Sequence, residues 1–168
     1  MPATYEPIAT TTLGSAAASI TFSSIPATYT DLRLILANTM VNAGTQPIIR
    51  FNGDTGTNYS QTFLRGNGST AFSGRSSGIA SIAINDANPA AGAGVPQMSC
   101  TDVFSYAGST YKTCLVQSSN DKNGSGTTQS LVGLWRDTSA INQITISEAS
   151  SNNFDTGTTA TLYGIKNA

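Results

Sequence analysis

Apolar and polar residues alternate along most of the chain, a period of two that is typical of β-strands with one buried face. The clearest run is 31–37, where Leu32, Leu34 and Leu36 share a face. Helical periodicity is almost absent. Runs of the same kind predict further strands at 5–12, 19–22, 47–51, 78–84 with Ile82 and Ile84 inward, 103–105, 111–117, 131–135, 141–147 with Ile144 and Ile146 inward, and 159–165. The pattern therefore predicts an all-β protein, an antiparallel, jelly-roll-like β-sandwich of about ten short strands.

Turn signals separate these runs. Asn52-Gly53, Asn67-Gly68 and Asn123-Gly124 are dipeptides that favour a left-handed turn without strain. Two segments, 66–78 and 85–96, are rich in Gly, Ser, Ala and Pro and carry few large apolar residues, so we expect long surface loops there. The stretch 61–65 fits a strand or a helical turn equally well.

The length of 168 residues indicates one domain, 1–168. Within it, 1–18 has an Ala-rich run and two prolines, Pro2 and Pro7, which favour an extended N-terminal arm. The start carries no basic residue followed by an apolar run, and no stretch approaches a membrane span. We therefore expect a protein made in a cytoplasm, without a secretory leader and without a membrane partner.

The composition narrows the function classes. Only 10% of the residues are charged, against about 25% in an average domain, and 74 of 168 are Thr, Ser, Asn or Gly. Eight scattered basic residues and a net charge of −1 argue against nucleic-acid binding. The absence of histidine excludes Ser-His-Asp and Cys-His nucleophiles and His-containing metal sites. Catalysis would depend on carboxylates such as Glu6 and Glu148, so we expect no enzyme, no catalytic residues and no cofactor.

Two cysteines, Cys100 and Cys114, flank a predicted hairpin. A three-residue loop at 106–108 would place Cys100 opposite Cys114 and Asp102 opposite Lys112. A two-residue loop at 107–108 would instead place Cys100 opposite Leu115 and exclude a disulfide. The sequence leaves both registers open, and two reduced thiols are favoured in a protein assembled inside a cell.

Three other features are candidate binding elements. The segment 121–126 offers oxygen ligands in calcium-loop spacing, but Val132 stands where the bidentate Glu belongs, so we expect a plain turn. The oxygen-rich segment 52–58 could hold a cation or a sugar, although a turn and polar loop are favoured. Trp135 is either core or an exposed platform, with core packing favoured. The same alternatives apply to Tyr59, Phe63 and Phe72.

Three stretches together resemble small virion proteins of tailed bacteriophages. They are 20–32 (ITFSSIPATYTDL), 50–54 (RFNGD) followed by Asn58 and Tyr59, and 162–165 (LYGI). The resemblance implies a β-sandwich on the virion surface, and the family supplies no catalytic motif to transfer.

Two functions follow as expectations from this resemblance. The first is a capsid decoration, or cement, protein that bridges subunits of the major capsid protein as a homo-oligomer, with a trimer favoured. The alternative is a tail-fibre or baseplate module that recognises a host surface glycan. In both cases we expect the protein on the virion surface after synthesis in the host cytoplasm.

Overall fold

The computed structural model describes residues 4–41, 46–85, 94–121, 123–150 and 152–166. These residues form no helix, and therefore no helix that could span a membrane. They form the strands β1 (Tyr5–Thr12), β2 (Ser19–Phe22), β3 (Asp31–Asn38), β4 (Pro47–Phe51), β5 (Tyr59–Gly66), β6 (Ala71–Ile79), β7 (Ile82–Ala83), β8 (Gln97–Phe104), β9 (Lys112–Asn120), β10 (Thr127–Trp135), β11 (Ile144–Glu148) and β12 (Thr159–Ile165).

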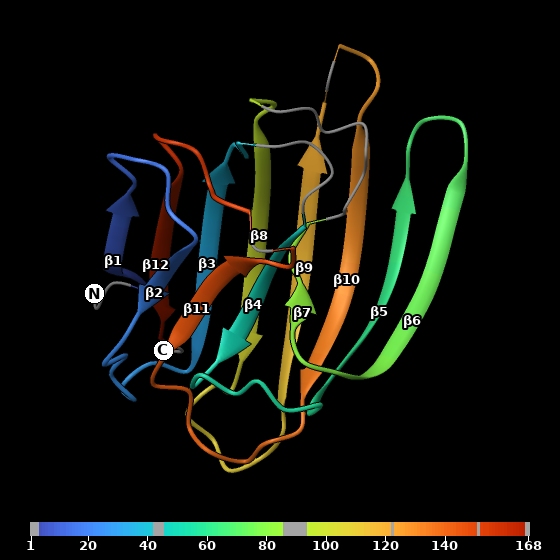
Figure 1. Ribbon diagram of the computed structural model, residues 1–168. Helices are drawn as coiled ribbons and strands as arrows, with labels where there is room; N and C mark the ends of the chain where they lie inside the picture. The colour runs from blue at the N-terminus through green and yellow to red at the C-terminus, as the bar shows by residue number, and fades with distance from the viewer. Residues whose placement is uncertain (1–3, 42–45, 86–93, 122, 151, 167–168) are drawn as a thin grey trace.

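Two antiparallel sheets of unequal size face each other. The large sheet has eight strands in the order β1-β12-β3-β8-β9-β10-β5-β6, and the small sheet has four in the order β2-β11-β4-β7. Figure 1 shows the small sheet in front of the middle of the large one, with β5 and β6 to one side of it. One face of the large sheet is therefore packed against the small sheet, and no sheet of the described residues covers the other face.

The core lies between the two sheets. Leu32, Leu34 and Leu36 of β3 are at most 1% exposed, because the alternation puts all three on the packed face. Side chains of the small sheet and of the strand ends meet them, and the buried set includes Ile20, Phe22, Ile49, Phe51, Ile82, Ile84, Ile144, Ile146 and Phe154. This burial confirms the inward positions expected for Ile82, Ile84, Ile144 and Ile146.

The all-β sandwich predicted from the alternation is confirmed. Four strands, β1, β2, β4 and β12, have the predicted bounds, and 61–65 lies in β5 as a strand. The Asn-Gly turns are also present, since Asn52, Gly53, Gly68, Asn123 and Gly124 all have positive φ. The jelly-roll connectivity is not confirmed, because the strand order gives sheets of eight and four.

The segment 66–78, predicted as a surface loop, instead forms most of β6. This strand pairs regularly with β5, from Ser60 opposite Ser77 to Gly66 opposite Ala71. It is an edge strand outside the core, so neither of its faces needed apolar residues and the alternation carried no signal. The other predicted loop, 85–96, lies largely outside the described residues.

The N-terminal arm expected at 1–18 is not free where the structure describes it. Residues 5–12 form β1, which pairs with β12 from Tyr5 opposite Ile165 to Thr12 opposite Thr159. Further along, Ala17 pairs with Phe154 in an isolated bridge. The segment is extended, but hydrogen bonds hold it at the edge of the large sheet.

Neither predicted register of the cysteine hairpin is correct. Cys114 lies opposite Val103, and Cys100 lies opposite Gln117. The connection is longer than expected, because Tyr106 is buried in the core and donates a hydrogen bond to the Pro26 carbonyl. The two thiols point to opposite faces of the large sheet, so they cannot form a disulfide with each other. Both are free, in agreement with the prediction of two reduced cysteines.

One part of the packed face is polar. Two neighbouring rows of buried polar side chains cross the strands β3, β8, β9 and β10, and we call them the polar rows. The first row is Asn38, Gln97, Asn120 and Thr127, and the second row is Ser99, Ser118 and Gln129. Asn85 donates to Gln97 at 2.7 Å. The side-chain polar atoms of Asn38, Asn120, Ser99 and Ser118, however, have no hydrogen-bond partner within the described part of the chain.

Candidate functional site

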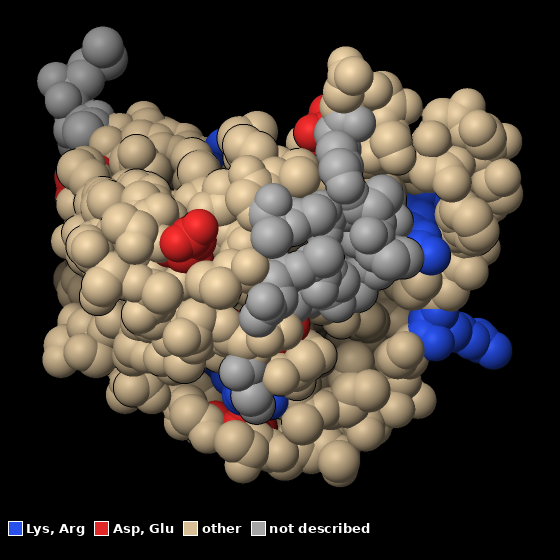
Figure 2. Space-filling model, turned by 45° about the horizontal axis from the view of Figure 1, so that its top comes forward, with Lys and Arg blue, Asp and Glu red and all other residues tan. Residues whose placement is uncertain are grey.

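The uncovered face of the large sheet is the most extensive feature that the fold leaves without an internal role. Strand pairing places alternate residues of all eight strands on this face. Charge is scarce on the other side of the molecule too, where Figure 2 shows separate small patches of acidic and basic residues. On the uncovered face, the strand register likewise leaves mainly neutral and apolar side chains outward.

The outward side chains of β1, β12, β3 and β8 form one half of the uncovered face, and we call this half the apolar half. Three large side chains protrude from it, Tyr5 at 43% exposure, Met98 at 57% and Phe104 at 44%. Between them, Arg33 donates two hydrogen bonds to Asp102, at 2.5 and 2.8 Å. This pair raises the pKa of Arg33. Asp31, two residues before Arg33 on β3, faces the same way, so the apolar half also carries one carboxylate that no cation compensates among the outward side chains of these strands.

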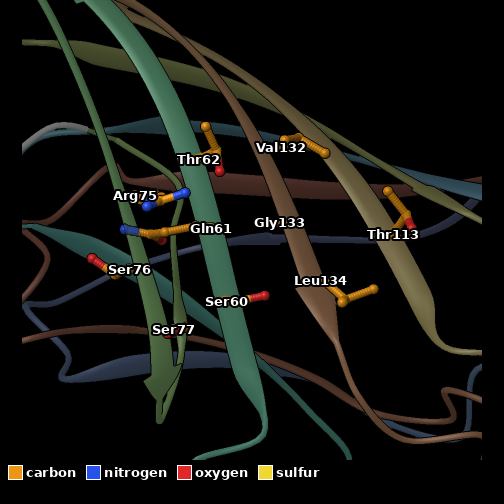
Figure 3. Close-up of a pocket in the computed structure, with 10 residues that line it drawn as sticks. All are labelled: Ser60, Gln61, Thr62, Arg75, Ser76, Ser77, Thr113, Val132, Gly133 and Leu134. Atoms are coloured by element: carbon orange, nitrogen blue, oxygen red, sulfur yellow. The ribbon is translucent and has the colours of Figure 1, made fainter.

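A groove crosses the other half of the face, over β9, β10, β5 and β6. We call it the hydroxyl groove. It has a volume of about 470 Å³, and its outward side chains form two rows across the strands. One row is Val132, Thr62 and Arg75, and the other is Thr113, Leu134, Ser60 and Ser77. Figure 3 shows these side chains around the groove, with Arg75 directed from β6 toward Thr62 on β5.

Arg75 is the one charged residue among the outward side chains of β9, β10, β5 and β6. It is exposed, and it makes no hydrogen bond or ion pair with any residue that the structure describes. The paired strands around it carry Ser, Thr and aliphatic side chains and no carboxylate. The groove therefore presents one uncompensated cation in a neutral polar setting.

The oxygen-rich segment 52–58 serves the fold instead of a ligand. The Asp54 carboxylate accepts hydrogen bonds from Trp135 Nε1 at 2.7 Å, Asn58 Nδ2 at 3.0 Å and Gly56 N at 2.8 Å. These bonds, the one from Trp135 first, lower the pKa of Asp54. Asn52 in turn binds the backbone of 140–143. The side chains of Asp54 and Asn52 therefore use their polar atoms to stabilise loops of the fold.

The aromatic candidates separate into core and surface. Trp135 and Tyr59 are at most 1% exposed and lie in a stacked arrangement with ring centroids 6.3 Å apart, so both are core residues. Phe63 is half-buried, and Phe72 is 39% exposed on the opposite side of the hairpin from the hydroxyl groove. The guanidinium of Arg65 lies over the Phe72 ring at 4.8 Å. No cluster of exposed aromatic rings forms here.

The carboxylate candidates are placed apart. Glu6, on β1 of the large sheet, accepts hydrogen bonds from Lys166 and Tyr29. Glu148, at the end of β11 in the small sheet, accepts backbone N–H bonds from Gln46, Ser150 and Asn152. The structure does not bring the two together into a glycosidase-like pair.

The calcium-loop segment forms the turn between β9 and β10. Asp121 Oδ1 accepts a hydrogen bond from Gly124 N at 2.8 Å. Within the described ranges, no three Cys, Asp or Glu side chains gather as metal ligands. The expected plain turn agrees with this geometry.

Two residues with specific roles were not identified from the sequence. Arg75 lies in a Gly/Ser-rich segment without alternation, so nothing indicated that it would face a groove. Lys112 is fully buried, and its ammonium donates to the carbonyls of Gly108 at 2.6 Å and Thr110 at 2.5 Å. Burial lowers the pKa of Lys112. The signal that the sequence offers is a lysine that alternates with Cys114 and Val116 in the predicted strand 111–117.

Comparison with known proteins identifies no relative. The sequence matches no protein-family model, and no curated protein matches it at a significant level. Any functional assignment therefore depends on the residues and surfaces described above.

Proposed function

We propose that this chain is a structural protein of a tailed-phage virion, a capsid decoration protein that docks on the coat lattice through the apolar half. The observation that carries the docking is the exposure of Tyr5, Met98 and Phe104 on one sheet face. These three side chains offer apolar area to a protein partner on one sheet face, and exposed apolar patches are typical of sites of protein association. The virion setting rests on the resemblance of 20–32, 50–54 and 162–165.

The charge distribution supports assembly in many copies. The apolar half holds one ion pair, Arg33 with Asp102, whose charges compensate each other, and one further carboxylate, Asp31. Neighbouring copies on a lattice therefore approach without strong like-charge repulsion. A modest contact by each copy becomes durable attachment when a homo-oligomer, with a trimer favoured, engages several coat subunits at once.

The test of docking is a charge placed in the apolar half. Met98→Glu should reduce binding to particles stripped of this protein at least tenfold, because the new carboxylate would be desolvated in the contact. Thr21→Glu adds the same charge on the exposed face of the small sheet and should bind normally. Equal binding of the two variants would show that the apolar half is not the contact.

Copy number tests the head assignment separately. A decoration protein should be present in hundreds of copies in each purified particle, as counted by quantitative mass spectrometry. About a dozen copies would instead favour a tail component.

The hydroxyl groove supports a second candidate, a tail-fibre or baseplate module that binds a host surface glycan. A groove of about 470 Å³ lined by Ser and Thr hydroxyls suits a polyhydroxylated ligand. Binding of the isolated protein to a glycan array, together with a low copy number, would favour this candidate over decoration.

A further inference from the structure

We propose that the hydroxyl groove binds an oligosaccharide that carries a carboxylate, with Arg75 as the residue that holds the acid group. This inference gives the glycan-binding candidate its ligand class. It does not depend on docking through the apolar half, which lies on the other strands of the sheet. Either proposal can therefore fail without the other.

The charge of the groove selects an anion. Arg75 lies in one row with Val132 and Thr62, and no acidic side chain faces outward from the four strands that build the groove. An arginine guanidinium binds a carboxylate through two parallel hydrogen bonds, and Arg75 need not release a partner among the described residues to do so. The Ser and Thr hydroxyls around it compensate no charge, so the ligand has to supply the negative group.

The remaining lining suits a sugar chain. Thr113 on β9, Ser60 on β5 and Ser77 on β6 place hydroxyls along one row, with Leu134 of β10 between the first two. The row spans three strand spacings, about 14 Å. Hydroxyls that both donate and accept match sugar hydroxyls, while Val132 and Leu134 offer an aliphatic floor to the C–H face of a ring.

An acidic peptide fits this surface less well than a sugar. The groove crosses the strands over their side chains, and the backbone groups of β9, β10 and β5 are already paired within the sheet. A peptide on the floor of the groove could therefore add no strand and would leave its own N–H and C=O groups without backbone partners, while strand addition would be confined to the outer edge of β6, away from Val132 and Leu134. A saccharide carries no such obligatory backbone groups.

Isothermal titration calorimetry with a trimer of galacturonic acid tests the inference. We expect the protein to bind this acid trimer more tightly than the neutral galactose trimer of the same linkage. Arg75→Gln should weaken binding of the acid trimer about 10- to 100-fold, the range expected when a hydrogen bond to a charged group is lost.

The matched control is Arg136→Gln. Arg136 is also exposed, donates to the Thr57 carbonyl at 2.7 Å away from the groove, and its loss changes the net charge equally. This variant should bind the acid trimer as the unmodified protein does. The inference is overturned if the acid trimer does not bind, if Arg75→Gln binds it normally, or if a triglutamate peptide binds as tightly as the acid trimer.

Discussion

Replacement of Asp54 by alanine should strongly destabilise the protein, because this carboxylate is the acceptor for the only tryptophan. Trp135 is 1% exposed, and Asp54 is the one acceptor that its indole N–H has among the described residues. A hydrogen bond to a charged group contributes about 1.5–3 kcal/mol, and the lost bonds from Asn58 and Gly56 add roughly 0.5–1 kcal/mol. We expect Asp54→Ala to lower the free energy of unfolding by about 2–4 kcal/mol.

Urea unfolding followed by far-ultraviolet circular dichroism measures this loss. With a slope of about 2 kcal/mol per M, the midpoint should fall by roughly 1–2 M. Asp121→Ala, which removes an exposed carboxylate that accepts one backbone N–H bond, should cost only about 0.5 kcal/mol.

A double-mutant cycle isolates the bond between the carboxylate and the indole. In a Trp135→Phe background, Asp54→Ala should cost about 1–2 kcal/mol less than in the unmodified protein. A loss below 0.5 kcal/mol for Asp54→Ala, or an unchanged loss in the Trp135→Phe background, would refute the assignment of Asp54 as the indole acceptor.

Three further predictions concern buried polar groups. Burial raises the pKa of Tyr59 and of Cys114 to about 12. The stability that this shift contributes is complete below about pH 9 for Tyr59 and below about pH 8 for Cys114, and it is lost as the pH rises toward 12. For Tyr59 the loss amounts to about 3 kcal/mol, and a flat unfolding free energy from pH 9 to 12 would contradict it. Lys112→Met should cost about 1–3 kcal/mol in urea unfolding, because two carbonyls lose their donor, and an unchanged midpoint would show that the ammonium is dispensable. A maleimide reagent should label half-exposed Cys100 in the native protein and Cys114 only after unfolding, as mass spectrometry of peptides would show; equal native labelling would contradict the burial of Cys114.

The strands that could be predicted are those whose one face lies in the core. The run through Leu32, Leu34 and Leu36 was readable because the small sheet covers that face alone, so apolar residues were needed at every second position only. The edge strand β6 has no such requirement, and its pairing with β5 follows from the Asn67-Gly68 turn instead. Alternation of apolar and polar residues thus indicates that one face of a strand is buried, and a strand outside the core shows no such alternation.

The hairpin register and the groove depended on long-range contacts. The β8–β9 connection is set by Tyr106, which reaches Pro26, and by Lys112, which binds carbonyls in the connection itself. The row that joins Val132 to Arg75 exists only because β5 lies between β10 and β6. Local turn preferences predict neither whether a loop residue is buried in the core nor the order of the strands in a sheet.

The polar rows have a consequence for how the protein opens. Asn38, Asn120, Ser99 and Ser118 are buried and gain no hydrogen-bond partner among the described residues, so this part of the sandwich contributes less stability than the leucine-rich part of the same strands. Opening that rehydrates these groups costs less than complete unfolding. Amide hydrogen exchange should therefore slow down along single strands, from fast near Asn38 to slow near Leu32, and the two ends of β3 would belong to different cooperative units.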